Sequence, residues 1–146
     1  MAEQKGNTVR LRVHLVSPIE KVFGFLATDA GRAAFWADSA VERDGVVHFQ
    51  FSNGMTHEGR LLTVVENQLF SVEYFGGSQA AFELELDGAG GTDLTLTETG
   101  IPDAWFDEHK AGWVSVLLVL KAAVDFSVNL RNPDPTRSWE QGYVDV

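Results

Sequence analysis

The sequence predicts an α+β fold in which a curled antiparallel sheet surrounds one long C-terminal helix. Positions 103–131 show a helical pattern whose centre, positions 113–120, is apolar on nearly every side, so another layer must cover it. Six strand-like segments precede this helix, and short turn-forming links join them. Two short helical segments separate those six from an N-terminal strand. We therefore expect the order β-α-α-β6-α in a single domain over residues 1–146.

Composition excludes several classes of function. The 146 residues include no cysteine, which removes disulfides, a thiol nucleophile and thiolate metal sites. A net charge of −10 argues against a nucleic-acid partner. No apolar run reaches the length of a membrane span, and the first eight residues do not resemble a secretory signal, so we expect a cytoplasmic protein. Motifs for metals, phosphates and catalytic serine or cysteine are missing, so we expect no metal and no cofactor.

The N-terminal region predicts a strand followed by a helix. Apolar and polar residues alternate over positions 9–15, as in a strand with one buried face. Ser17, Pro18 and Glu20 fit the N-cap, N1 and N3 positions of a capping box. This pattern predicts a helix that ends near Leu26.

A second short helix and six strands should follow. Thr28 or Asp29 is suited to cap the helix, which should end near Trp36. Turn dipeptides and short polar links then make sequential antiparallel neighbours the simplest arrangement. The strands are expected at positions 40–43, 46–51, 55–65, 69–75, 79–86 and 92–99.

The pairing of the second and third of these strands is ambiguous. A two-residue loop at Asn53-Gly54 would place Phe49 on the same face as Glu58, which makes a poor core. Either a β-bulge near Gly59 or an odd number of loop residues would restore an apolar face.

The last two strands have clearer faces. Phe82, Leu84 and Leu86 should point inward on one, and Leu94 and Leu96 on the other. Glu98 shares that inward face near a strand end, where we expect the face to reach solvent. If Glu98 is enclosed instead, its pKa should rise and it becomes the one candidate acid.

The long helix should begin at the N-cap Asp103 and stop before Asn132-Pro133. Gly112 would allow close approach to its backbone, and the neighbouring Trp113 either plugs an internal cavity or forms its wall. Leu118 interrupts the polar face and could serve a homodimer contact. Beyond the helix, Trp139 and Tyr143 are expected to hold the tail against the surface.

Five short motifs together resemble a known family. They are positions 17–23 (SPIEKVF), Phe35-Trp36, Gly59 with positions 61–66, positions 91–97 (GTDLTLT) and positions 111–120 (AGWVSVLLVL). The set is similar to the activator-of-Hsp90-ATPase-homologue (AHSA1-like) branch of the helix-grip superfamily, also called Bet v 1-like or START-like. The resemblance implies a curled sheet gripping the C-terminal helix. It also implies either a lipid-, polyketide- or hormone-like ligand or a chaperone-accessory role.

Three hypotheses about function follow. The first is a binding protein for a small apolar or aromatic ligand, held between the sheet and the long helix. Its candidate site residues are Trp36, Phe49, Phe51, His57, Tyr74, Glu98, Trp113 and Leu117. The second is a cyclase- or hydrolase-type enzyme with Glu98 or His57 as acid or base. The third is a chaperone-associated interaction protein. His109, near the expected cavity mouth, is interpreted as a solvated or locally bonded histidine rather than a ligand.

Overall fold

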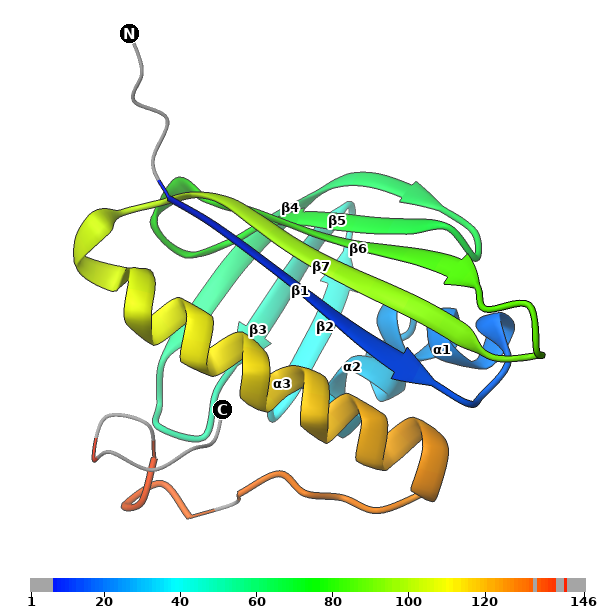
Figure 1. Cartoon of the computed structure of the whole chain (residues 1–146). Coiled ribbons are helices and arrows are strands. Elements are labelled where there is room, and N and C mark those ends of the chain that lie inside the picture. Colours follow the sequence, from blue (N-terminus) through cyan, green and yellow to red (C-terminus); the bar gives the residue numbers. More distant parts are fainter. Residues whose placement is uncertain (1–6, 133, 139–140, 142–146) are drawn as a thin grey trace, which may run out of the picture.

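A seven-stranded antiparallel sheet curls around the long helix (Figure 1). The computed structural model describes residues 7–132, 134–138 and 141. The strands are β1 (Asn7–Leu15), β2 (Ser39–Arg43), β3 (Val46–Gln50), β4 (Thr56–Val65), β5 (Leu69–Glu73), β6 (Gln79–Leu86) and β7 (Thr92–Ile101). They lie in the order β1-β7-β6-β5-β4-β3-β2, so β2 to β7 form a meander and β1 joins beside β7. The predicted fold class and element order are confirmed.

Three α-helices in the described residues lie against this sheet. They are α1 (Ile19–Ala27), α2 (Asp29–Phe35) and α3 (Phe106–Phe126). Figure 1 shows α3 running across the open side of the sheet, while α1 and α2 close one end of it. Short 3₁₀ turns at Phe75–Gly77 and Asp103–Trp105 lie at the other end, where α3 begins. No helix in the described part of the chain is long and apolar enough to cross a membrane.

The predicted capping box of α1 is wrong. Pro18 is the N-cap, and no side chain caps the helix. The Ser17 hydroxyl instead lies 2.8 Å from Asp125 Oδ1 on α3, and the Ser17 N–H donates to the same oxygen at 3.2 Å. This tertiary contact uses the side chain that the local motif would have needed. For α2, the prediction holds, because Thr28 Oγ1 accepts from the Gly31 N–H at 3.0 Å.

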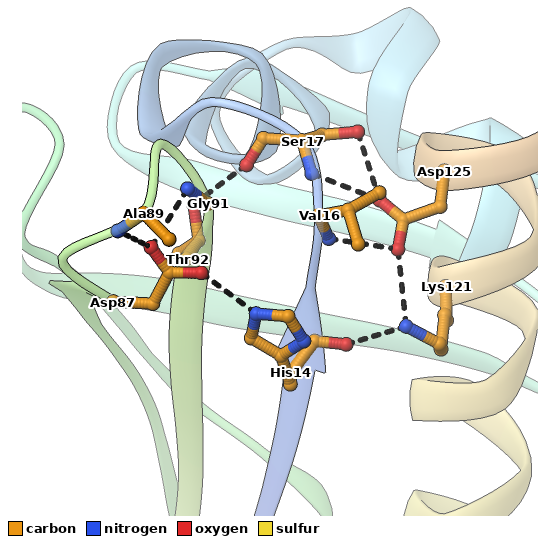
Figure 2. Close-up of polar contacts among 9 residues, drawn as sticks. All are labelled: His14, Val16, Ser17, Asp87, Ala89, Gly91, Thr92, Lys121 and Asp125. Atoms are coloured by element: carbon orange, nitrogen blue, oxygen red, sulfur yellow. Dashed lines mark hydrogen bonds and ion pairs between the residues drawn. The ribbon is translucent and has the colours of Figure 1, made fainter.

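A polar network joins the C-terminal half of α3 to the end of β1 (Figure 2). Asp125 accepts from the Val16 N–H at 3.0 Å and from Lys121 Nζ at 3.1 Å. Lys121 also donates to the His14 carbonyl at 2.6 Å. Burial alone would raise the pKa of Asp125, but these hydrogen bonds and that of Ser17 hold it below its usual value. The network fixes the far end of the helix against the sheet.

The loop between β3 and β4 settles the ambiguous register. The Gly54 N–H donates to Phe51 O at 3.0 Å, and the Phe51 N–H donates to Met55 O at 2.9 Å. Three residues, 52–54, therefore form the loop, with Gly54 at φ 91°. Phe49 pairs with His57 and not with Glu58. The two-residue loop is wrong, and the alternative of an odd loop length is confirmed.

Close approach of two strands at Gly59 produces a sharp part of the curl. A Cβ atom at Gly59 would overlap the Glu73 carbonyl oxygen on β5, which no side chain could tolerate. The pairing of β4 with β5 then shifts register between Leu61 and Thr63. The glycine and the following irregularity let β2, β3 and the first half of β4 fold toward α3.

The long helix is shorter than predicted at both ends. Trp105 is its N-cap, and Asp103 accepts a hydrogen bond from Asn7 Nδ2 at 2.6 Å rather than capping the helix. At the other end Ser127 adopts the left-handed region, with φ 55° and ψ 36°. The Val128 N–H then closes the last turn on Ala122 O at 3.0 Å. The helix therefore ends well before the predicted proline stop. That proline, at position 133, lies outside the described residues, as do Trp139 and Tyr143.

Faces of β6 and β7 largely agree with the sequence pattern. Phe82, Leu94 and Leu96 are fully buried, whereas Leu86, expected to point inward, is 72% exposed. Leu86 is the last residue of β6. At Glu98 the expectation that the face reaches solvent is wrong, because this side chain is fully buried.

Candidate functional site

Aromatic side chains fill the space between the sheet and the middle of α3. Trp36, directly after α2, is fully buried, and its ring centroid lies 4.9 Å from that of Phe49 on β3 and 5.1 Å from that of Phe82 on β6. From the helix side, the ring of Trp113 lies 5.9 Å from Trp36. The Trp36 indole N–H donates to Tyr74 Oη at 3.2 Å, so this buried donor has its hydrogen-bond partner within the cluster. The space between the sheet and the middle of α3 is therefore filled by side chains.

Glu98 on β7 lies at the edge of this aromatic cluster and accepts hydrogen bonds from separate segments. The Trp113 Nε1–H donates to Oε1 at 2.6 Å, and the Ser78 hydroxyl lies 2.5 Å from Oε2. The Ser78 hydroxyl also lies 2.9 Å from the Phe75 carbonyl oxygen, so its single proton has two acceptors within reach. A buried carboxylate is costly unless it is paired in this way.

His109 provides the third contact with Glu98. Its Nδ1 atom lies 2.9 Å from Oε1 and 2.8 Å from Oε2 of the carboxylate. An ionised carboxylate only accepts, so Nδ1 carries a proton and donates it. The side chain of His109 is 10% exposed. Trp105, one helical turn earlier, stacks on the imidazole with an interplanar angle of 20°.

The second ring nitrogen of His109, Nε2, makes no hydrogen bond to the described residues. The imidazole lines a pocket between the first half of α3 and the sheet. Tyr74, Phe75 and Trp113 supply aromatic walls, and the remaining lining residues are Phe51, Glu108, Gly112 and Val116. The cavity volume is about 30 Å³, room for a group the size of one water molecule. A polar nitrogen held in fixed orientation thus adjoins a small, mostly aromatic pocket.

The residues expected to form the site divide into two groups. Phe51, Tyr74 and Trp113 line the pocket, and Glu98 lies directly behind it. Trp36, Phe49 and Leu117 are buried in the core. His57 contacts the pocket residue Phe75 through its ring. His57 Nε2 lies 3.1 Å from the Glu73 carbonyl oxygen.

Glu98 and His57, the two candidates for an acid or base, have different partners in the structure. Among the described contacts, Glu98 pairs with His109 rather than with His57 or Tyr74. Burial raises the pKa of Tyr74 above its usual range, so its phenol stays neutral and acts only as a hydrogen-bonding group. In the described part of the chain, no group of three acidic, histidine or cysteine side chains could hold a metal ion.

Residues 17–125 match the family described as activator of Hsp90 ATPase homolog 1-like protein. The chain belongs to this AHSA1-like family. The matched region contains every member of the Glu98 network: Ser78, Glu98, His109 and Trp113. A comparison with curated proteins found no significant match.

Several solved structures share the AHSA1-like fold. The solution structure of the Aha1 dimer from Colwellia psychrerythraea has 20% identity and a TM-score of 0.74, over 82% of this chain and 97% of its own. A Staphylococcus saprophyticus protein has 23% identity and a TM-score of 0.74, over 86% and 96%. A Chromobacterium violaceum protein has 26% identity and a TM-score of 0.68, over 82% and 98%. These similarities establish the helix-grip architecture.

Sequence reasoning missed the role of His109 in this AHSA1-like protein. One available signal was its spacing from Trp113, because residues four apart lie on the same face of a helix. Trp113 was expected to face the sheet, so His109 had to face it as well. The partner segment carrying Ser78 gave no comparable signal, because it lies in a turn whose position depends on the curl of the sheet.

Proposed function

We propose that this protein binds a small apolar or aromatic molecule in the pocket between β5, the Phe75–Gly77 turn and the first half of α3. One observation carries the proposal: a fully buried carboxylate, Glu98, holds His109 at the edge of an aromatic pocket. Buried charges with directed partners are concentrated at functional sites. An apolar residue could fill the position of Glu98 without the desolvation cost, so the polar arrangement favours recognition over packing.

The pocket lies beside the first half of α3 rather than at the centre of the aromatic cluster. Trp36 and Phe82 already occupy the central space, so a ligand would enter beside Phe51 and Phe75. With a cavity of about 30 Å³, only a single small group fits without movement. The rest of a ligand would rest against the aromatic rim or displace its side chains. Membership in the AHSA1-like family is compatible with this use of the fold but does not identify the ligand.

Titration with a small aromatic probe tests the proposal. With 4-nitroanisole, we expect a raised melting temperature and NMR shifts of the Trp113 and Trp105 indole N–H signals. The Trp36 indole, bonded to Tyr74 in the packed cluster, is the internal reference and should shift less. Native mass spectrometry of the purified protein would separately reveal a bound small molecule. An unchanged melting temperature together with unchanged indole signals at saturating probe would disprove binding at this pocket.

A matched pair of variants locates the site. Phe51→Leu removes a ring from the pocket rim, and Phe126→Leu removes a 66% exposed ring at the opposite end of α3. Probe affinity should fall in the first variant and stay unchanged in the second. Equal affinities in both variants would place any binding elsewhere.

We also propose self-association through the outer face of α3. Val114 is 42% exposed and Leu118 is 56% exposed, one helical turn apart on that face. The related solution structure from Colwellia psychrerythraea is described as a dimer, which supports a second copy as the occupant. A chaperone partner is supported only by the description of the family and stays a prediction.

A further inference from the structure

We propose that the pocket recognises a phenol and that His109 Nε2 accepts the proton of its hydroxyl group. This inference rests on the proposed binding function and specifies the chemistry of the ligand. It depends on the orientation of the imidazole, the size of the cavity and the charges around it.

Glu98 determines which nitrogen of His109 faces the ligand. Because Nδ1–H donates to the carboxylate, the neutral imidazole presents Nε2 as an acceptor. The ring is nine-tenths buried and stacked against Trp105, so rotation would break both contacts. An acceptor requires a donor on the ligand, which a hydroxyl supplies and an ether or ester does not.

The cavity favours a hydroxyl attached to an aromatic ring. A volume of about 30 Å³ accommodates one oxygen-sized group, and a planar ring could then lie against the side chains of Tyr74 and Phe75 at the rim. These two rings meet nearly edge to face, with centroids 4.8 Å apart and an interplanar angle of 66°. An aliphatic alcohol would satisfy the hydrogen bond but leave the aromatic rim without a matching surface.

Charges around the site favour a ligand that enters neutral. Three titratable groups lie around the imidazole: Glu98 behind it, Tyr74 beside it and Glu108 at the pocket rim. Two of these are carboxylates and the net charge is −10, so a carboxylic acid would be repelled on approach. A phenol carries no charge until its proton moves, and the negative charge then develops beside a positive imidazolium.

The proton transfer is balanced within the pocket. The phenolic O–H bond breaks, an Nε2–H bond forms, and the phenolate oxygen accepts a hydrogen bond from the new N–H. His109 becomes an imidazolium whose other N–H remains on the Glu98 carboxylate, so the total charge of the site does not change. No oxidant, metal or co-reactant enters this step. The Glu98–His109 pair acts as a proton acceptor by the same geometry that orients general bases.

Two probes separate this inference from the binding proposal. 4-Nitrophenol reports its ionisation through the visible absorbance of the phenolate, whereas 4-nitroanisole has the same ring but no hydroxyl. Below the pKa of free 4-nitrophenol, we expect the ionised fraction to rise about tenfold on binding, which is one pKa unit. His109→Gln should bind both probes without forming phenolate, and His48→Gln, altered at a 30% exposed histidine that is not part of the pocket lining, should behave as the wild type.

Each result decides one of the proposals. Binding of both probes without phenolate in the wild type overturns the phenol inference and leaves the binding function intact. Failure of both probes to bind overturns both. Equal phenolate in wild type and His109→Gln shows that another group takes the proton, which also overturns the inference. If His109→Gln does not fold, the ¹⁵N shift of wild-type Nε2 on adding 4-nitrophenol decides, because protonation moves it and simple packing does not.

Discussion

His109 Nδ1 lies within 2.9 Å of both carboxylate oxygens of Glu98. This contact connects α3 to β7. Because the carboxylate accepts and cannot donate, it fixes the tautomer as Nδ1–H. Replacing its charge should therefore alter the chemistry of the opposite nitrogen.

Glu98→Gln should reverse the tautomer of His109. The amide oxygen introduced by this substitution can still accept from Trp113, which leaves the amide NH₂ facing the imidazole. Nδ1 then becomes the acceptor and the proton moves to Nε2. Ring ¹⁵N chemical shifts measure this directly. Glu58→Gln, which alters the exposed partner of His48, serves as the control and should leave His109 unchanged. Persistence of the Nδ1–H form in Glu98→Gln would contradict the assignment.

Trp113→Phe should destabilise the protein by about 1.5–3 kcal/mol, the range for a lost hydrogen bond to a buried charge. The phenylalanine keeps most of the packing against Trp36, but the Glu98 oxygen loses its donor. Urea unfolding measures this difference in the free energy of unfolding, and the slope of that free energy against urea concentration should be the same in both proteins. Trp105→Phe is the matched substitution at a 41% exposed tryptophan and should cost clearly less. Similar losses for both would mean that packing, not the hydrogen bond, dominates.

Gly76→Ala should cost more stability than Gly77→Ala. Both glycines have positive φ, 71° and 81°, so alanine strains the backbone at either position by about 1–2 kcal/mol. Only at Gly76 would the new Cβ also clash, 2.7 Å from the Trp105 ring. The extra loss should be about 1–3 kcal/mol, as for overpacking. Because Trp105 stacks on His109, the Gly76 variant should also shift the His109 ring signals, whereas the Gly77 variant should not.

The contact between His14 and Asp87 should make stability depend on acidic pH. A hydrogen bond with His14, followed by those from the Ala89 and Gly91 N–H groups, lowers the pKa of Asp87 from 3.8 to about 2. Because the pKa is depressed in the folded state, the stabilisation is complete above 3.8 and disappears as the pH falls toward 2.

Asp87→Asn provides the measurement for that pH effect. The wild type should be the more stable protein at neutral pH, and its advantage in urea unfolding should shrink between pH 3.8 and about 2. A stability difference that does not change across this window would show that the pKa of Asp87 is not lowered in the folded protein. His14 and Asp87 can be followed in Figure 2.

Leu118→Asp should weaken self-association if the outer face of α3 is the contact. A charge placed at this 56% exposed position would have to be desolvated in the interface. Light scattering over a concentration series measures the change in mass. Leu130→Asp is the matched control, because Leu130 is 58% exposed but lies beyond α3. A mass that is equally concentration-dependent in all three proteins would exclude this face.

The sequence by itself determined the order of the elements and most of their bounds. Alternation places Leu94, Leu96 and Glu98 on one face of β7, and that face is buried as a unit. The 3.6-residue period likewise places Trp113 toward the sheet. These are local properties, since the side-chain directions in a strand or helix follow from backbone geometry alone. The family resemblance also followed from short local motifs.

Tertiary structure alone decided whether Glu98 is enclosed and what it contacts. Its partners come from positions 78, 109 and 113, on a turn and a helix that meet β7 only after the sheet has curled. The curl depends on Gly59 and on the three-residue loop after β3, where one residue more or less reverses every face. The start of α3 was decided in the same way, because Asp103 accepts a hydrogen bond from Asn7, far away in the sequence, instead of capping the helix.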